Sequence, residues 1–408
     1  MNVLFLSLDT SPNNKVHKIT SSFIRKDMEH LHKKGHKIYY LSDVLENDVI
    51  ENEVNYISKD KLLEKNSFLR RVKNLFFALR HLGFFGFMII KRMRSTLYIC
   101  GVERACIKAV KKFGIDIIHT NFLTPNGESA VLSSMDCNVP VVATLRGAEL
   151  RAMKEFDYGA LLDQFFECML RKSVKYIHCI TAPNKFLCEK LRSDFKVPEE
   201  KIRWVPNGVE RMSIEKNQSD PNADIIFISV ANLIKLKNLD VVLLSAKELS
   251  NEFNFRIVIV GDGILRGKYE EMIRELLIKN VTILNQMLKP ELFKLMAKCD
   301  CLIHPSFSEG MPNVVLESLA IGVPCIVSDI PAHRDVIKEG VNGFFFDPYD
   351  KESLKSRMRR ILLNRNILAG MERNCVKTVE KFSIEKRVDR FIEIYNEVKR
   401  FKELAGRS

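Results

Sequence analysis

The chain of 408 residues lacks the sequence patterns that mark metal-binding and disulfide-rich proteins. Its ten cysteines include no Cys-x-x-Cys pair, and no histidine cluster stands at zinc spacing. Cys299 and Cys301 are alternate residues of a predicted strand, which indicates packing rather than metal ligation. We therefore expect reduced, mostly buried thiols, no metal site and no bound cofactor.

Targeting signals and long apolar runs are also missing. The N-terminal segment "MNVLFLSLDT" has no basic lead-in and no small-residue cleavage site, so we expect a cytoplasmic protein without a secretory signal. The stretch "HLGFFGFMII" (81–90) has ten largely apolar residues, whereas a bilayer-spanning helix needs about 20. This stretch is not predicted to cross a membrane.

Acidic residues are absent from residues 65–102, where eight lysines and arginines contribute to the net charge of +13. Apolar residues recur there at helical spacing, on the side away from Arg70 and Arg71: Leu69, Val72, Phe76 and Leu79. A basic amphipathic segment with phenylalanines is typical of contact with an anionic membrane, here through residues 65–94. An ordinary surface helix followed by a core helix is the alternative. Nucleic acid is not an expected partner, because no nucleic-acid-binding motif accompanies the charge.

Short apolar runs alternate with longer amphipathic stretches along the whole chain. Examples are "IDIIHT" and "VPVVATL" in the first half, and "FRIVIVGDG" and "CDCLIHPS" in the second. Such alternation predicts parallel sheets covered by helices on both faces. The expected fold class is α/β, with two doubly wound, Rossmann-like domains facing a cleft. The predicted parts are an N-terminal domain, a polar linker, a C-terminal domain and a final helix, over residues 1–209, 210–222, 223–382 and 383–408.

The final helix opens at Ser383 and carries an apolar stripe that must be buried against another element. The stripe consists of Ile384, Val388, Phe391, Tyr395 and Val398.

In doubly wound sheets, ligands bind beyond the carboxyl ends of the strands. The stretch "HPSFSEGMPNVVLES" (304–318) lies at such a place, with Glu309 before a predicted helix and Glu317 inside it. The amides of residues near the helix start favour an anion such as a diphosphate. The amides are those of Gly310, Met311 and Asn313, and Pro312 in the same turn is a further donor-binding candidate. Two carboxylates flanking an anion-binding turn suit a nucleotide sugar. The alternative is a helix-capping Glu309 and a solvated Glu317.

This stretch resembles the E-x7-E signature of the family-four retaining glycosyltransferases of the GT-B fold, the glycosyltransferases of group 1. Nearly the whole chain shares the resemblance. Other segments that are similar to family motifs are "VPNGVE" (205–210), "VANLIKLKNLD" (230–240), "GDG" (261–263) and "GVNGFFFDP" (340–348).

The resemblance implies roles for particular residues. Glu317 would bind the ribose hydroxyls, Glu309 the hydroxyls of the donor sugar, and Lys237 the diphosphate. Asn232 stands where the family commonly has arginine, so one positive charge is lost, for which Lys235 or Arg146 could compensate. We name Glu309, Lys237 and Arg146 as catalytic candidates. The family also implies retention by front-face attack, without a nucleophilic Glu309. No Asp-x-Asp metal motif with a matching strand-end context is present, so we expect transfer without a metal.

The N-terminal half supplies candidates for the acceptor side. Arg146 and Glu149 in "TLRGAEL" take the places of a family His and Asp, and an arginine cannot serve as a general base at pH 7. Binding of a phosphate or carboxylate is one hypothesis for Arg146, and a turn closed by an Arg146–Glu149 pair is the other. Ser21 and Ser22 replace a family Gly-Gly loop.

Polar residues near the ends of predicted strands are treated separately. His119 and Asn121 follow "IDII" and are expected to line the acceptor site, with a plain strand-end role as the alternative. His304, before Pro305, is expected to be structural.

The sequence thus predicts a glycosyltransferase that moves a sugar from a nucleotide-diphosphate sugar to a lipid-linked or polysaccharide acceptor in cell-surface glycan biosynthesis. It is expected at the inner face of the membrane. Two other hypotheses remain open at this stage: a nucleotide-sugar epimerase or phosphorylase of the same architecture, and a non-enzymatic membrane-surface binding protein. Donor base, donor sugar, acceptor and oligomeric state have no residue pattern that specifies them.

Overall fold

The computed structural model describes most of the chain, namely residues 1–7, 22–42, 45, 47–63, 67–81, 83, 92–212, 214 and 223–405. Contacts divide the chain into two compact units, which are unit 1 (residues 1–206 with 384–408) and unit 2 (207–383). Ser21, much of the segment 65–94 and most of the predicted linker 210–222 lie outside the described residues.

The described part of unit 1 contains an eight-stranded sheet that is parallel except for one edge pair. In spatial order its strands are β3 (Val49–Glu51), β4 (Val54–Ser58), β2 (Lys37–Ser42), β1 (Asn2–Leu6), β5 (Ile117–Asn121), β6 (Val141–Thr144), β7 (Cys179–Ala182) and β8 (Ile202–Trp204). Apolar and exposed polar residues hardly alternate along the central strands, because helices cover both faces of the sheet.

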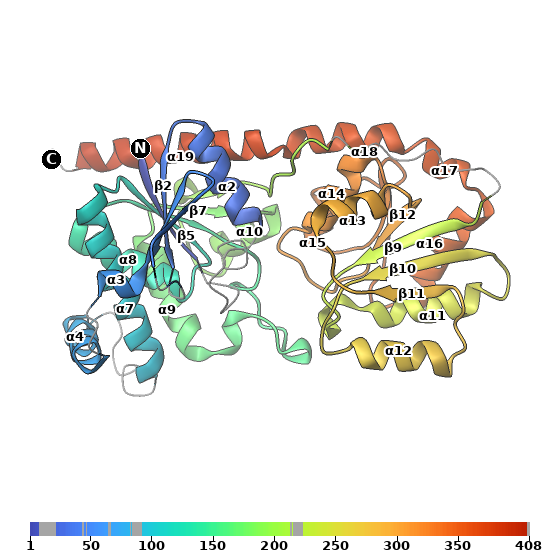
Figure 1. The fold of residues 1–408 in the computed structure, drawn as a ribbon, viewed down its shortest axis with the longest axis horizontal. Coiled ribbons are helices and arrows are strands. Elements are labelled where there is room, and N and C mark those ends of the chain that lie inside the picture. The colour runs from blue at the N-terminus through green and yellow to red at the C-terminus, as the bar shows by residue number, and fades with distance from the viewer. Residues whose placement is uncertain are drawn as a thin grey trace. The chain divides into compact units, whose positions relative to one another are not determined.

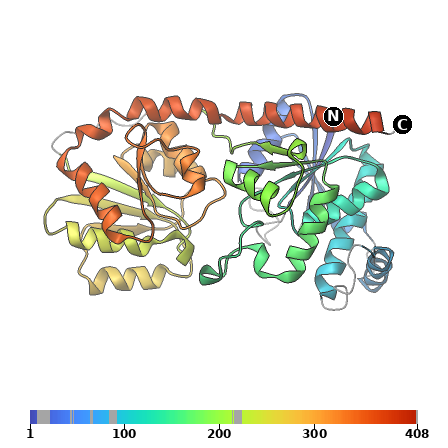
Figure 2. The ribbon, with the colours of Figure 1, turned by 180° about the vertical axis from the view of Figure 1, so that it is seen from behind.

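Two groups of helices cover this sheet (Figures 1 and 2). One face packs against α2 (Ser22–Lys33) and α19 (Ile384–Ala405). The helices that belong to the other face are α3 (Lys59–Leu62), α4 (Ser67–Arg80), α7 (Met93–Phe113), α8 (Asn126–Cys137), α9 (Gln164–Tyr176) and α10 (Lys185–Ser193).

Alternate residues of the strands of unit 1 enter two different cores. Leu4 and Ile118 face α7 and α8, whereas Val3 and Phe5 face α2 and α19. The predicted stripe of the last helix is buried, as expected, in this second core. Segments at opposite ends of the sequence thus share one hydrophobic core.

Unit 2 contains a six-stranded sheet whose described strands are all parallel. In spatial order they are β11 (Val281–Leu284), β10 (Phe255–Val260), β9 (Ile225–Val230), β12 (Cys301–His304), β13 (Cys325–Ser328) and β14 (Gly343–Phe346). The chain first builds outward from β9 to β11 and then returns to the other side of β9 with β12. The point between β9 and β12 is therefore a topological switch point, beyond which doubly wound folds bind ligands.

Helices flank this second sheet as well (Figure 1). On one face, α11 (Leu239–Leu249), α12 (Arg266–Glu275) and α16 (Lys351–Leu363) pack together. On the other face lie α13 (Lys289–Met296), α14 (Asn313–Ile321) and α18 (Glu372–Val379). Two shorter helices, α15 (Pro331–Arg334) and α17 (Asn366–Ala369), complete the α-helices of the described part.

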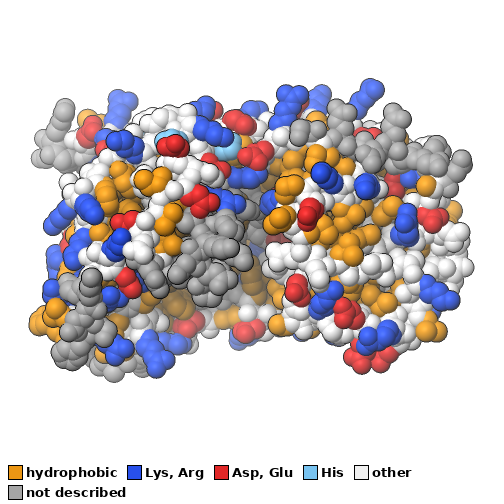
Figure 3. Space-filling view, viewed as in Figure 1, with side chains coloured by type: hydrophobic (Ala, Val, Ile, Leu, Met, Phe, Trp, Pro, Cys, Tyr) orange, Lys and Arg blue, Asp and Glu red, His pale blue; other side chains and the backbone are white. Residues whose placement is uncertain are grey.

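Helix α4, in the basic segment, does not bury its predicted apolar stripe. Leu69, Phe76 and Leu79 are 42%, 68% and 47% exposed. The helix packs on α7 instead through Ala78 and Asn74, whose side-chain Nδ2 donates to the Leu97 carbonyl at 3.0 Å. Orange and blue side chains accordingly lie together at the lower left of Figure 3, where Figure 1 places α4. Among the described residues, no helix has the length and apolar character needed to cross a bilayer.

Candidate functional site

Two loops meet beyond the switch point of unit 2. The loop after β9 forms a short 3-10 helix (Lys235–Lys237), and the loop after β12 carries Glu309. The Phe307 amide donates to the Leu236 carbonyl at 2.9 Å and joins the two loops. Across this junction Lys237 Nζ lies 2.5 Å from Glu309 Oε1. Residues 72 positions apart in the chain thus form one ion pair.

The Gly-Asp-Gly segment after β10 supports the loop that carries Lys237. The Leu233 amide donates to the Asp262 carbonyl at 2.9 Å. Gly261 has φ +157°, and a Cβ there would lie 1.9 Å from the Ala231 carbonyl oxygen. Glycine is required because the two loops touch backbone to backbone at this point.

Glu309 is held as a carboxylate. Burial by itself would raise the pKa of Glu309, but the Lys237 charge and a hydrogen bond from His304 hold that pKa well below its ordinary value. His304 Nε2 lies 3.0 Å from Glu309 Oε1. The expectation that His304 is only structural therefore overlooked a direct contact with the candidate site.

Glu317 lies in α14 and is 8% exposed, so the hypothesis of a solvated Glu317 is wrong. Its carboxylate forms an ion pair with Lys289, the first residue of α13, which follows β11. Lys289 is not among the candidates that the sequence motifs suggest. The only available signal was its place in a loop at the carboxyl end of a predicted strand.

Asn207 organises the turn that precedes α14. Its amide donates to Met311 Sδ at 3.0 Å, and its side-chain Nδ2 donates to Asn313 Oδ1 at 2.9 Å. The "VPNGVE" segment pointed to this residue without revealing the contact. Pro312 precedes the first helical residue, and the amides of the first turn have no carbonyl four residues earlier within the helix. Partial positive charge therefore gathers at the turn between Glu309 and Glu317.

Two residues considered for the diphosphate in unit 2 lie at its surface. Asn232 and Lys235, in the loop after β9, are both exposed. Lys237, in contrast, is largely buried, with 17% of its side chain exposed.

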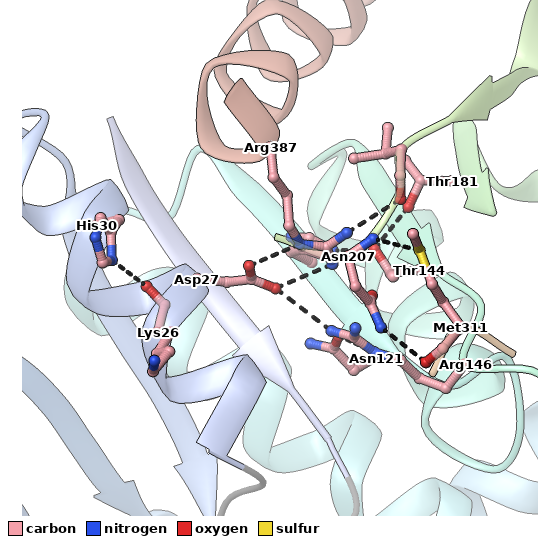
Figure 4. Close-up of polar contacts among 12 residues, drawn as sticks. Lys26, Asp27, His30, Asn121, Thr144, Arg146, Thr181, Asn207, Met311 and Arg387 are labelled. Atoms are coloured by element: carbon pink, nitrogen blue, oxygen red, sulfur yellow. Dashed lines mark hydrogen bonds and ion pairs between the residues drawn. The ribbon is translucent and has the colours of Figure 1, made fainter. Parts of the chain in front are cut away.

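In unit 1, Arg146 follows β6 and lies in a buried polar cluster (Figure 4). Its guanidinium donates to Asn121 Oδ1, with an Nε distance of 3.1 Å, and approaches Asp27 Oδ2 at 3.5 Å. Arg387 from α19 forms two further bonds to Asp27, at 2.8 and 3.1 Å. Burial, reinforced by the neighbouring Arg387, lowers the pKa of Arg146 to about 9. The centre of the Phe23 ring lies 4.4 Å from Cζ of the Arg146 guanidinium.

Glu149 closes a turn, although not through an Arg146 side-chain pair. Its carboxylate accepts the backbone amides of Arg146 and Gly147, with shortest distances of 2.9 and 2.8 Å. Burial raises the pKa of Glu149, while these bonds act in the opposite direction. Its observed contacts are therefore structural.

His119 lies inside the core that is covered by α19. Its Nδ1 is 2.5 Å from the Tyr395 hydroxyl, and its Nε2 is 2.7 Å from Thr144 Oγ1. The side chain has no exposed surface, so His119 does not line an open acceptor site. Burial lowers its pKa well below the ordinary value and keeps the ring neutral. Asn121 is also buried, but its side-chain Nδ2 has no hydrogen-bond partner among the described residues.

The structure describes no side-chain positions for the two serine candidates. Ser21 lies outside the described residues, and Ser22 begins α2 with an undescribed side chain. Within the described ranges, no three His, Cys, Asp or Glu side chains gather in a way that could hold a metal ion.

Two family models account for most of the chain. "Glycosyltransferase Family 4" matches residues 23–211, and "Glycosyl transferases group 1" matches residues 211–382. Each model therefore covers approximately one of the two units.

Similar proteins are glycosyltransferases. An uncharacterised glycosyltransferase of Methanocaldococcus jannaschii is 25% identical over 309 residues, which is 76% of this chain and 83% of that protein. The UDP-Gal:α-D-GlcNAc-diphosphoundecaprenol α-1,3-galactosyltransferase of Escherichia coli is 28% identical over 325 residues, with coverage of 75% and 80%.

Solved structures agree on the fold. The Anabaena protein HepE in complex with UDP-glucose superposes with a TM-score of 0.70 at 13% identity, over 97% of this chain and 100% of that chain. This likeness identifies the fold as GT-B. With two α/β units, two matching family models and transferases among its relatives, the chain belongs to the group 1 glycosyltransferases.

Proposed function

We propose that this glycosyltransferase transfers a sugar, with retention and without a metal ion, from a nucleotide-diphosphate sugar to a lipid-linked or polysaccharide acceptor in cell-surface glycan synthesis. The observation that carries the proposal is the Lys237–Glu309 pair beyond β9 and β12, next to the first turn of α14. Cation, amides and two carboxylates there provide partners for a diphosphate and for hydroxyls on both sides of it.

The proposed chemistry follows from the charge that develops during transfer. As the bond between the anomeric carbon and the phosphate oxygen breaks, the sugar becomes oxocarbenium-like and the nucleoside diphosphate gains negative charge. Lys237 and the amides of Gly310, Met311 and Asn313 stabilise the departing diphosphate. Glu309 orients the sugar and supports its positive charge, and Glu317 binds the ribose. Retention is assigned to front-face attack assisted by the leaving phosphate.

Lys289 is a better candidate for charge compensation near the donor than Lys235 or Arg146. It is bound to Glu317, whereas Lys235 is exposed and Arg146 is occupied by Asn121 and Asp27. We assign Lys289 a place beside the ribose and the diphosphate of the donor.

On the acceptor side, Asn121 is as fully buried as His119, so it too lines no open acceptor site in this structure. Arg146 holds its Oδ1, while the side-chain Nδ2 keeps two N–H groups with no partner in the described part. A lipid-linked acceptor is supported by the Escherichia coli relative, whose name specifies a diphosphoundecaprenol-linked sugar.

A membrane contact is supported by helix α4. Its exposed Leu69, Phe76 and Leu79 lie on the same helix as Arg71 and Lys73. Apolar and basic side chains on one surface helix suit the interface of an anionic bilayer. Arg70 and Arg80 contribute less, because they pair with Asp60 and Asp136 at 2.7 and 2.6 Å.

The donor site is tested by ligand-induced thermal stabilisation, with wild type beside Glu317→Ala and Lys237→Ala. The panel comprises the diphosphates of uridine, guanosine, adenosine and thymidine and the corresponding nucleotide sugars. Uridine comes first because the name of the Escherichia coli relative specifies UDP-Gal and the similar structure of HepE is a complex with UDP-glucose. A ligand at 100 times its Kd stabilises by about 2.7 kcal/mol, so a true donor gives a clear shift. Equal shifts in all three proteins, or none, would contradict the proposal. Exposed Lys298→Ala is a matched control that should leave the shift unchanged.

Once a donor is identified, chelation and stereochemistry test the finer claims. Activity should persist in excess EDTA, and nuclear magnetic resonance of early product should show the anomeric configuration of the donor. Loss of activity in EDTA that added divalent cations restore would exclude metal independence.

Membrane contact is tested by vesicle flotation. The Phe76→Ser, Leu79→Ser variant should lose binding to vesicles with anionic lipid, whereas Leu363→Ser, at an exposed leucine of α16, should not. Wild-type binding should weaken at high salt. Equal flotation of the two variants would exclude α4 as the contact.

A further inference from the structure

His304 is the last residue of β12, directly behind the candidate donor site. Its side chain is 3% exposed. Nε2 lies 3.0 Å from Glu309 Oε1, and Nδ1 is buried with no hydrogen-bond partner in the described part of the chain. Nε2 also lies 3.4 Å from Ser306 Oγ, so its contact with Glu309 is the shorter of the two.

The contacts of His304 define which nitrogen carries the proton. An ionised carboxylate only accepts hydrogen bonds, so Nε2 is the N–H that donates to Glu309. The ring thus directs its Nε2–H at the Glu309 carboxylate, while Nδ1 has no hydrogen-bond partner among the described residues.

A second histidine fixes the orientation of that ring. The rings of His304 and His333 meet edge to face, with centroids 5.3 Å apart and an interplanar angle of 73°. His333 Nδ1 lies 2.6 Å from the Ser328 carbonyl, so this nitrogen is the donor. Burial lowers the pKa of His333 to about 3, and its ring remains neutral. His304 therefore rests against an uncharged, anchored neighbour in the interior of unit 2.

Glu309 has two partners that differ in mobility. Lys237 reaches the carboxylate with a flexible four-carbon side chain, whereas His304 is held by the core. In the proposed function the ammonium of Lys237 also binds the diphosphate. When it turns toward the phosphate oxygens, its contact with Glu309 weakens, and the contact with His304 is unaffected.

We infer that His304 is a positioning residue that keeps the Glu309 carboxylate directed at the donor sugar while Lys237 engages the diphosphate. This inference rests on the proposed function, because it assigns Glu309 to the sugar and Lys237 to the phosphates. The role of His304 concerns binding of the donor sugar, and binding of the nucleotide does not depend on it.

The test compares the dissociation constants of the nucleoside diphosphate and of its sugar conjugate, measured by calorimetry on the full chain. His304→Leu should bind the diphosphate within about twofold of wild type. Its affinity for the sugar conjugate, relative to that for the diphosphate, should fall roughly tenfold to a hundredfold, and turnover should fall by a similar factor. The reason is that a hydrogen bond to a charged group is removed. His304→Gln, which can place an N–H near the same carboxylate, should recover part of the loss.

A second variant and a control separate positioning from simple destabilisation. His304→Phe keeps a flat ring against His333 but has no donor, so it should resemble His304→Leu even if the leucine variant does not fold. Ile303→Val, in the same strand and fully buried, costs about 0.5–1.5 kcal/mol of stability and should leave the affinity ratio unchanged.

The outcomes distinguish the inference from the function on which it rests. A wild type that binds no nucleotide sugar would overturn both. The wild type is expected to bind the sugar conjugate more tightly than the nucleoside diphosphate. If folded His304 variants show the same difference in affinity, the role of His304 is overturned and the proposed function stays intact. A ratio that falls equally in Ile303→Val would show a structural effect only and would also overturn the inference.

Discussion

At the scale of single residues, the chain buries an acid that no proposed step uses. Glu128 lies in the first turn of α8 and has no exposed surface. Burial raises its pKa to about 8. The folded protein therefore holds a proton at neutral pH that the unfolded chain releases, because an ordinary glutamate ionises near pH 4.3.

This difference predicts a pH-dependent stability. Since the folded-state pKa is raised, the contribution of Glu128 is fully present below about pH 4 and is lost as the pH rises toward 8, by about 1.4 kcal/mol per unit. Glu128→Gln should remove that slope, so the variant should gain roughly 2–3 kcal/mol relative to wild type between pH 6 and pH 8. Urea unfolding followed by the fluorescence of Trp204, the single tryptophan and a residue of unit 1, measures it. A constant difference between the two proteins across this range would contradict the assignment.

At the scale of elements, the Gly-Asp-Gly loop decides whether the loop that carries Lys237 can form. Gly261→Ala places a methyl group 1.9 Å from the Ala231 carbonyl oxygen at φ +157°, so the backbone must move. We expect a loss of several kcal/mol and at least tenfold weaker nucleotide binding.

The matched control is Gly267→Ala, in the same unit. Gly267 lies in α12, and a methyl group added there would have no neighbouring atom within 4 Å, while alanine favours a helix by about 0.5–1 kcal/mol. Thermal unfolding by circular dichroism should therefore move in opposite directions for the two variants. A Gly261→Ala protein with wild-type melting and wild-type nucleotide binding would contradict the role of this loop.

Elements also show where pattern and packing diverge. The stripes of α19 and of the central strands are buried as their periodicity predicts, because each has a large apolar face and a sheet to cover. In α4 the same kind of stripe is exposed, since α7 packs against Asn74 and Ala78 instead. Periodicity identifies an apolar face but does not say whether protein or another surface covers it.

At the scale of the whole molecule, the two units differ in how the chain builds them. The core of unit 2 uses residues between Val209 and Phe382 alone, whereas a core of unit 1 includes six side chains of α19 with little or no exposed surface. At about 1.5–3 kcal/mol each, they contribute on the order of 10 kcal/mol, which is comparable to the entire stability of a domain.

Deletion of residues 384–408 should therefore unfold unit 1 and spare unit 2. Trp204 emission should shift to that of a solvated indole, while nucleoside diphosphate should still stabilise the remaining folded part. Retention of the native Trp204 signal would show that α19 is dispensable. As a control, a chain that ends after Ala405 should behave as wild type.

The sequence by itself determined the fold class and the two-sheet organisation, because strand periodicity is a local property. Glu309 and Lys237 became candidates through motifs that resemble those of the family, and their donor roles stay a prediction. Only the tertiary structure decided which side chains contact these residues. It brought Lys289 to Glu317, His304 to Glu309 and Asn207 to the turn before α14, and it placed His119 in the core. These contacts join residues on different elements or depend on side-chain direction at a strand end. Burial and pairing arise only when those elements pack, and no local pattern encodes them.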